Sequence, residues 1–386
     1  MAEGECERIA EHYRAFANAA ASRSPRYRDW AAGIAVDAEL LDLISSLPRG
    51  KRDPQFVFAC ARVAGVPPRP FASARADFIE LWSGITATAK ARRNHRTSPS
   101  WNVGLIIALQ QIKGPIALID VSAEVGYSVI PDAFAYDLHA RGRSYQVGES
   151  PVHLPASLTG WGANPPTIPA ITYREGIDPA PLNGDQDDVA WLLAREFPEG
   201  EIRGLIADSA ELVLKANPLI TKGAVAATIR GAVARARRAA PKATIVLWSP
   251  FVVERLPKTE RVEFEKYCSR AKLHWVSLDH GDADGACALT IDGRRIATTD
   301  IDCRDVVVEN MHGLTPDELD LIEFERVYWG PLRSKESLVR KHWSLSLVRY
   351  YQLLYAIMES VAARRYDPIL VRAFDEAKDQ PARRGR

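Results

Sequence analysis

A short turn of small and acidic residues is the first place in the chain where residue types and spacing could do chemistry. It reads Asp120-Val121-Ser122-Ala123-Glu124-Val125-Gly126 and follows the apolar run Ile116 to Val121. In a strand-to-helix turn of this kind, small residues let the backbone approach a nucleotide cofactor, and the helix N-terminus offers free N–H groups and a partial positive charge. The turn therefore predicts a cofactor site, with a ligand-free turn as the alternative.

Two residues in this turn depart from an acid-x-Gly-x-Gly-x-Gly pattern, which Gly126 matches. Ser122 stands where the first glycine is expected, and its side chain costs about 1–2 kcal/mol if the backbone is left-handed. Glu124 suits the helix dipole, but its charge would repel a pyrophosphate or the carboxylate of an amino-acid group. We therefore expect Asp120, Ser122, Glu124 and Gly126 to form an altered cofactor site that binds a dinucleotide poorly.

Asp178 lies in Gly176-Ile177-Asp178-Pro179, where the second strand of a sheet would end. An acid at this place accepts hydrogen bonds from ribose hydroxyls in nucleotide-binding sheets, so Asp178 is a candidate cofactor ligand. Capping of the turn before Pro179 is an equally common use of Asp-Pro. Asp137, in a strand-like run, is a rival for the ribose.

Trp248 and Ser249 open the turn Trp248-Ser249-Pro250-Phe251 at the C-terminal end of a buried strand. Open parallel sheets bind ligands outside these ends, so Ser249 could hydrogen-bond a substrate beside Trp248. A plain strand-to-loop turn is the alternative.

Alternating strands and helices predict the elements that position these residues. Strand-like runs occur at 116–121, 167–174, 244–248 and 273–278, with two final strands around Asp292-Gly293, and helical stretches at 187–197, 202–216, 224–239 and 258–270 separate them. This order predicts an α/β fold with a Rossmann-like, mostly parallel sheet over residues 113–312. Helical periodicity predicts an N-terminal region, 1–112, and a C-terminal extension, 313–386, in which 334–364 forms one helix with a broad apolar face.

Three segments carry a family resemblance: 120–137 (DVSAEVGYSVIPDAFAYD), 173–192 (YREGIDPAPLNGDQDDVAWL) and 244–279, which ends in HWVSLD. In order and spacing they resemble the bacterial family catalogued as domain of unknown function 2332, over roughly residues 10–310. Members of that family look like S-adenosylmethionine methyltransferases in fold. The resemblance implies a Rossmann-like sheet of methyltransferase type, with S-adenosylmethionine as the cofactor, which the turn should bind poorly because of Ser122 and Glu124. In amino-methylating enzymes a similarly placed Asn/Asp-Pro-Pro turn holds the target nitrogen, and here Ser249 stands in place of the Asn/Asp.

The chain departs from the family pattern at two further places. Lys222-Gly223-Ala224 replaces a Gly-Asp near the expected adenine site, and Thr97-Ser98-Pro99-Ser100-Trp101 replaces a polar stretch before the first strand. The chain therefore looks like a divergent member, either a methyltransferase-like protein acting on a small molecule or a non-catalytic binding or partner subunit that kept the fold and lost the cofactor site.

Composition argues against nucleic-acid, membrane and metal partners. The 386 residues carry 50 Lys and Arg against 49 Asp and Glu, and this balance of +1 predicts no nucleic-acid partner. The basic segment Lys90 to Arg96 is expected to be a solvated loop. Apolar runs are too short for a membrane span, and the five scattered cysteines predict neither a zinc site nor a disulfide framework, so we expect a cytoplasmic protein with no membrane or metal partner. The apolar face of 334–364 predicts packing against the protein or, in a homodimer, against a second subunit.

The sequence DHGDADG, from Asp279 to Gly285, invites a metal interpretation. It lacks the downstream glutamate of a calcium loop at the required offset, so a solvated turn is expected.

Overall fold

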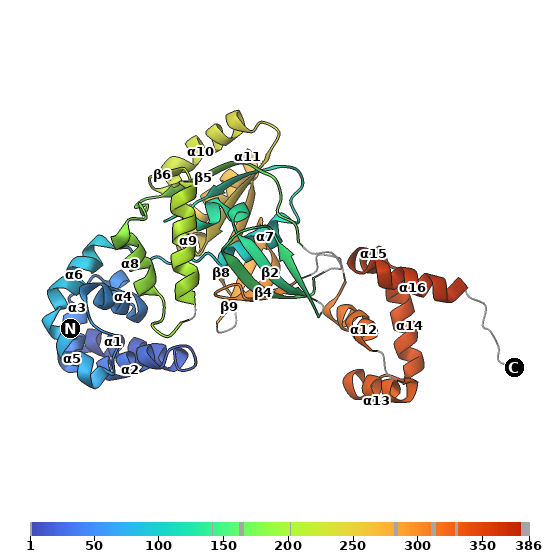
Figure 1. The fold of residues 1–386 in the computed structure, drawn as a ribbon, viewed down its shortest axis with the longest axis horizontal. Helices are drawn as coiled ribbons and strands as arrows, with labels where there is room; N and C mark the ends of the chain where they lie inside the picture. Colours follow the sequence, from blue (N-terminus) through green and yellow to red (C-terminus); the bar gives the residue numbers. More distant parts are fainter. Residues whose placement is uncertain are drawn as a thin grey trace. The chain divides into compact units, whose positions relative to one another are not determined.

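The computed structural model describes residues 2–140, 142–161, 166–200, 202–281, 285–309, 314–328 and 331–379. The architecture is α/β, with a mixed, mostly parallel sheet and helices at both ends of the chain (Figure 1). The sheet has eleven strands in the order β3-β2-β4-β11-β10-β9-β8-β7-β1-β5-β6. Their bounds are β1 Ile116–Asp120, β2 Ala135–Ala140, β3 Arg143–Val147, β4 His153–Thr159, β5 Ile171–Asp178, β6 Ile220–Lys222, β7 Thr244–Pro250, β8 His274–His280, β9 Ala286–Ile291, β10 Arg294–Asp300 and β11 Asp305–Val308.

The chain divides into two compact units. Unit 1 contains 1–99, 123–127 and 178–222, and unit 2 contains 100–122, 128–177 and 223–386. Because the turn after β1 belongs partly to each unit, its residues are described below with the unit that holds them. No helix among the described residues is both long and apolar enough to cross a membrane.

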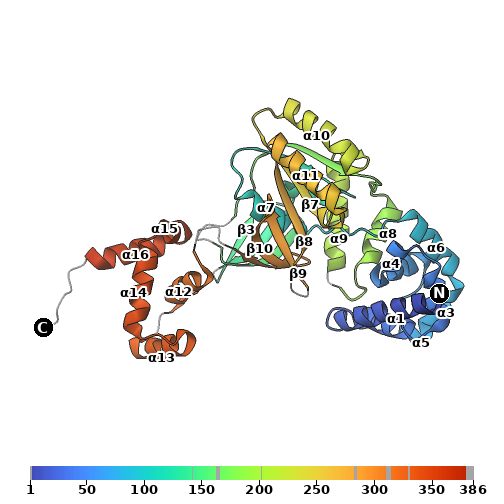
Figure 2. The same ribbon diagram turned by 180° about the vertical axis from the view of Figure 1, so that it is seen from behind.

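The inner strands of unit 2 are apolar because both faces of the sheet are covered. β1 is buried at every residue and pairs in parallel with β5 and β7, with Asp120 opposite Trp248. One face of the sheet packs against the helices α10 (Val225–Ala239) and α11 (Lys258–Ala271), which Figure 2 shows side by side. The buried helix α7 (Trp101–Leu109) contacts β8 and β9. Such two-sided burial explains the unbroken apolar runs of these strands.

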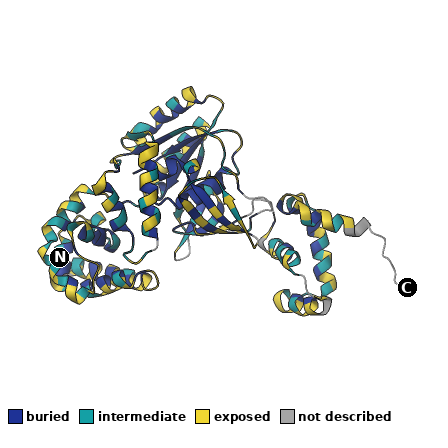
Figure 3. Ribbon diagram, viewed as in Figure 1, coloured by how far each residue is buried: buried dark blue, intermediate teal, exposed yellow. Residues whose placement is uncertain are grey.

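Unit 1 is helical. Its core joins aromatic side chains of the N-terminal helices to Trp191 and Ala194 of α8. Tyr27, Trp30 and Phe58 are fully buried within it, and Figure 3 shows how the buried residues line the inner sides of these helices. The helices are α1 Ala2–Ala19, α2 Pro25–Ile34, α3 Ala38–Ser45, α4 Pro54–Ala64, α5 Phe71–Glu80, α6 Trp82–Ala91, α8 Gln186–Arg195 and α9 Ile202–Ala216.

The C-terminal helices have a hydrophobic core of their own, formed by residues such as Ile322, Tyr350, Leu354 and Tyr366. The helices are α12 Pro316–Val327, α13 Leu332–Trp343, α14 Leu347–Met358, α15 Val361–Tyr366 and α16 Pro368–Asp379. The expected apolar face is therefore buried, but within this bundle.

Three sequence-based expectations need correction. The single helix expected at 334–364 is three helices, because Ser344 is left-handed and Ser346 and Ser360 cap new helices. Three strands, not two, follow residue 285, since β11 returns after the β9–β10 hairpin. The strands β2, β3 and β4, of which only the start of β2 was expected, extend the sheet beyond the parallel part.

Candidate functional site

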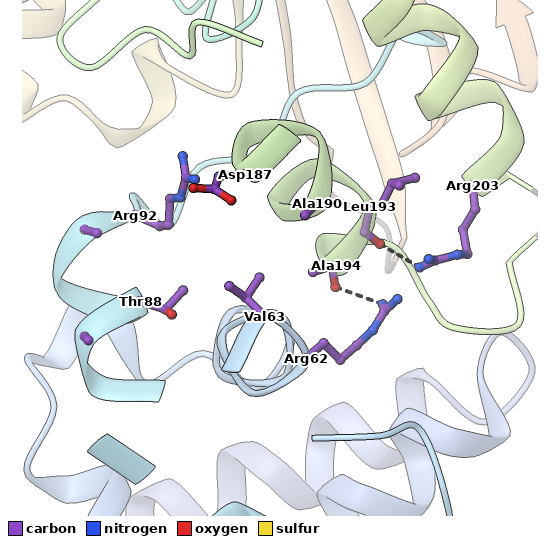
Figure 4. A pocket seen from close by; sticks show the side chains of 11 residues that line it. Arg62, Val63, Thr88, Arg92, Asp187, Ala190, Leu193, Ala194 and Arg203 are labelled. Atoms are coloured by element: carbon purple, nitrogen blue, oxygen red, sulfur yellow. Dashed lines mark hydrogen bonds between the residues drawn. The ribbon is translucent and has the colours of Figure 1, made fainter. Parts of the chain in front are cut away.

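A groove of about 700 Å³ is hollowed into unit 1 between α4, α6, α8 and the start of α9 (Figure 4). Its lining combines small or aliphatic residues, among them the exposed Val63, with polar and charged ones, including Thr88 and Asp187. Three arginines, Arg62, Arg92 and Arg203, provide its positive charge. The volume falls within the range of about 300–1,000 Å³ that small-molecule sites occupy.

Arg62 and Arg203 lie at one end of the groove because both bind the C-terminal end of α8. Arg62 Nη1 donates to the carbonyl of Ala194 at 2.9 Å and to that of Glu196, and Arg203 Nη1 donates to the carbonyl of Leu193 at 2.7 Å (Figure 4). The last carbonyls of a helix lack partners within the helix and carry partial negative charge, so guanidinium groups suit this place.

Neither guanidinium has a carboxylate partner within 4 Å among the described residues. Arg203 has a pKa below its ordinary value, because the group is partly removed from water and because Arg62 repels the charge. Glu196 attracts Arg203 more weakly, and its own ion pair is with Arg96, at 3.5 Å. Two like charges therefore share one end of the groove, where their hydrogen bonds among the described residues go to backbone carbonyls and, for Arg62, also to the Tyr27 hydroxyl at 3.3 Å. This arrangement favours an anion.

Arg92 differs from this pair because its guanidinium is paired with Asp188. It also borders a second, smaller cavity of about 210 Å³ in the same unit, which is lined by Ala91, Arg92, Arg93, Glu124, Ala180, Pro181, Leu182, Asn183, Asp185, Asp188 and Trp191. Much of this lining comes from the GIDPAPLN…D…WL segment that carries the family resemblance. The cavity is small for a nucleotide cofactor.

Glu124, which lines this smaller cavity, is bound to protein groups. Its carboxylate accepts two hydrogen bonds from Arg195, each 2.9 Å, and one from the Thr97 hydroxyl. The side chain is 5% exposed. Its backbone is left-handed, with φ +46°, and the carbonyl accepts from the Leu182 N–H at 3.0 Å. The charge expected to repel a cofactor is thus neutralised by Arg195.

Asp178 is fully buried beside Glu124, so the structure brings these two candidate residues together. Its Oδ1 accepts from Arg93 Nη1 at 2.6 Å and from the Ala180 N–H at 2.8 Å, and its Oδ2 accepts from the Glu124 N–H at 3.1 Å. A carboxylate has about four acceptor sites, and three are occupied here. The one acceptor site that remains cannot serve both hydroxyls of a ribose.

Gly126 also serves internal packing. Its φ is +101°, and a β-carbon at this position would lie 2.9 Å from Pro218 Cγ and 3.2 Å from Ile220 Cδ1. The glycine is required by the turn and by the chain that packs on it.

The basic segment Lys90 to Arg96 begins in the last turn of α6 and continues as a loop, and its three arginines are paired and not simply solvated. Arg92 pairs with Asp188, Arg93 with Asp178 and Arg96 with Glu196. Within the segment His95 is buried, and burial lowers the pKa of its imidazole.

The remaining predicted site residues lie in unit 2. Asp120 Oδ1 accepts from the Ser122 N–H at 2.8 Å, which fixes the beginning of the turn. Ser249 is fully buried, and its hydroxyl accepts from Trp275 Nε1 at 2.6 Å. Trp248 is fully buried on β7. In the structure these three side chains therefore make internal contacts at the carboxyl ends of β1 and β7.

Two other motifs have structural roles. Asp137 pairs with His153 across the exposed face of β2 and β4. In the DHGDADG segment, His280 pairs with Glu254 and Asp279 accepts from Ser277, while Asp282 and Asp284 lie outside the described residues. The described part of the chain contains no group of three His, Cys, Asp or Glu side chains suited to a metal ion.

Sequence reasoning did not find Arg62 or Arg203. The two residues are distant in sequence and lie in no motif, and each is an ordinary charged position on a helix. Only the fold shows that both reach the end of α8.

Comparison with known families gives two matches. Residues 69–306 match a family described as uncharacterized protein conserved in bacteria (DUF2332), and residues 313–385 match a family described as protein of unknown function (DUF3263). No curated protein and no solved structure matches the chain. Because the first match covers more than half of the sequence, the chain belongs to the DUF2332 family of uncharacterized proteins conserved in bacteria.

Proposed function

We propose that this protein binds an anionic small molecule in the groove of unit 1, as a binding protein and not as a methyltransferase. The observation that carries the proposal is the Arg62–Arg203 pair, in which two guanidinium groups with no carboxylate partner in the described part of the chain lie at one end of a groove of about 700 Å³. An anion placed there relieves the repulsion that the two arginines now exert on each other.

The ligand class follows from the lining. A phosphate or carboxylate can bind both guanidinium groups, because each keeps N–H donors beyond those of Nη1 and a guanidinium has five in all. The apolar wall, with Val63 and Ala190, suits a ligand with an aliphatic or aromatic body. We therefore infer an organic phosphate or carboxylate that is larger than the anion alone.

Loss of a nucleotide cofactor is supported by the contacts of the predicted cofactor residues. Asp178 and Glu124 are held by protein donors, and Gly126 is used for packing. Binding S-adenosylmethionine at these residues would require breaking the buried Glu124–Arg195 pair and the partly exposed Asp178–Arg93 pair. The groove is then the better site for a ligand.

A methyltransferase-like function is the second candidate, and the strand order favours it. The strands β5-β1-β7-β8 are parallel in the order of a doubly wound sheet, with Asp120 of β1 opposite Trp248 of β7 at the carboxyl ends. The strand order reverses between these two parallel strands, because the chain places β5 on one side of β1 and β7 on the other, and such sheets bind cofactors at this point. In this case S-adenosylmethionine binds near Asp120 and Ser122 of unit 2, and a substrate lies near Ser249 of the same unit.

Calorimetric titration distinguishes the anion-binding function from the methyltransferase-like one. We expect pyrophosphate or an aromatic phosphate to bind the wild-type protein, and Arg62→Gln or Arg203→Gln to weaken binding about tenfold or more, since a hydrogen bond to a charged group is worth about 1.5–3 kcal/mol. The matched control is Arg28→Gln, an exposed arginine on α2 of the same unit. Tight binding of S-adenosylmethionine, insensitive to both groove variants, would favour the second candidate.

A further inference from the structure

The C-terminal bundle contains two consecutive helices joined by three residues. α13 ends at Trp343 and α14 begins at Leu347. Ser344 adopts the left-handed conformation, with φ +56°, which redirects the chain, and the Ser346 hydroxyl accepts from the Arg349 N–H at 3.2 Å and so caps α14. Figures 1 and 2 both show α13 lying across the end of α14. Two helices joined in this way by a turn of three or four residues form a helix-turn-helix.

One face of α14 is fixed in the bundle. Tyr350, Leu354 and Ile357 are buried in its core. The Tyr350 hydroxyl donates to Glu325 Oε2 of α12 at 2.8 Å, and Lys335 of α13 donates to the hydroxyl of Tyr351 at 3.0 Å. The packing therefore holds α14 rigidly and determines which residues it presents outward.

The opposite face of α14 is exposed. It presents Val348, Arg349, Gln352 and Ala356, which follow one another at helical spacing. Val348 on this face is 70% exposed. Arginine, glutamine and a small apolar residue are the types that recognise guanine, adenine and the thymine methyl group in the major groove.

Charge is distributed unevenly along the chain. Residues 332–386 carry twelve Lys and Arg against six Asp and Glu, whereas residues 1–331 carry 38 against 43. The whole-chain balance of +1, from which we expected no nucleic-acid partner, conceals this basic segment. Arg340 and Lys341 are exposed in the last turn of α13, next to the helix-turn-helix turn.

We propose that α13 and α14 bind double-stranded DNA, with the exposed face of α14 in the major groove and Arg340 and Lys341 on the phosphates. In this motif the second helix enters the groove and the first crosses the backbone. The major groove of B-form DNA is wide enough for a helix, whereas that of A-form RNA is too narrow, so the geometry favours DNA. This interaction is independent of the anion site in unit 1.

The test uses the full chain. Fluorescein-labelled duplexes of about 20 base pairs, two helical turns, are selected from a random-sequence pool and measured by fluorescence anisotropy. We expect Arg349→Ala and Gln352→Ala each to weaken binding to the selected sequence about tenfold and to relax its sequence preference. Arg340→Ala and Lys341→Ala should weaken binding to all duplexes alike and reduce the salt-dependence slope by about one.

Arg261→Ala, which removes the same charge from an exposed position on α11, is the matched control and should change nothing. Circular dichroism verifies that each variant keeps its helices. No enriched sequence, an unchanged affinity of Arg349→Ala and Gln352→Ala, or stronger binding of single-stranded RNA than of any duplex each overturns the proposal.

Discussion

Removal of the Glu124 carboxylate should destabilise unit 1 strongly, because this group neutralises Arg195. The two side chains are 5% and 8% exposed and share two hydrogen bonds of 2.9 Å. Breaking a buried pair by deleting one partner costs about 3–5 kcal/mol, since the other charge is left unpaired. Glu124→Leu and Arg195→Met should each lower the free energy of unfolding by about this amount.

The double variant should lose much less than the sum of the two single losses, because no unpaired charge remains. It still lacks the hydrogen bond from Arg195 to the His95 carbonyl, so we expect a residual cost of about 1 kcal/mol. Urea denaturation followed by circular dichroism and tryptophan fluorescence measures all four proteins. Glu265→Leu, which breaks the exposed pair with Arg261, is the control and should cost less than about 0.5 kcal/mol.

A loss below about 1 kcal/mol for Glu124→Leu would refute the reasoning. The carboxylate would then be hydrated and free to face a ligand, as the turn sequence alone suggests. Binding of S-adenosylmethionine near the turn would become a serious alternative again.

Three further predictions concern stability. Burial lowers the pKa of His95, so below pH about 6.5 the unfolded chain binds a proton that the folded chain does not. The free energy of unfolding should therefore fall by up to about 1.4 kcal/mol for each unit by which the pH is lowered. Urea denaturation at pH 7.5 and 5.5 should show this fall in the wild type and not in His95→Phe, and the same fall in both proteins would contradict the prediction. Gly126→Ala should lower the free energy of unfolding by about 2 kcal/mol, through its positive φ and its contact with Pro218, and an unchanged thermal midpoint would count against the packing described. Ser344→Gly should stabilise the C-terminal bundle by about 1 kcal/mol because it relieves a left-handed serine, and thermal denaturation that shows a loss would reveal a role for the hydroxyl.

The parallel part of the fold follows from sequence because its strands are buried on both faces and read as unbroken apolar runs. β1 and β7 begin where their runs begin, at Ile116 and Thr244. In the N-terminal region α4 runs from Pro54 to Ala64, because Asp53 caps its start and Gly65 ends it. β4 alternates between exposed and buried residues and contains a proline, Pro155, so its signal is weaker. The C-terminal helices were merged because apolar spacing continues across the capping serines.

The site was harder to predict because its contacts join distant segments. Asp178 has the right type and place for a ribose ligand, and only the fold reveals that Arg93, 85 residues away, occupies its carboxylate. The same holds for Glu124 and Arg195, which are 71 residues apart. Ion pairs of this kind leave no local pattern, so residue type suggests chemistry that tertiary contacts then reassign.

Ligand-dependent thermal stability tests the central claim most directly. The wild-type protein is heated with inorganic phosphate, pyrophosphate, citrate, an aromatic phosphate and S-adenosylmethionine, in parallel with Arg62→Gln, Arg203→Gln and the control Arg28→Gln. Because a ligand that binds the folded state raises the midpoint, we predict a rise with at least one of the anions in the wild type and in the control, and its loss in both groove variants. A rise with S-adenosylmethionine alone, or one that persists in both groove variants, would contradict the account.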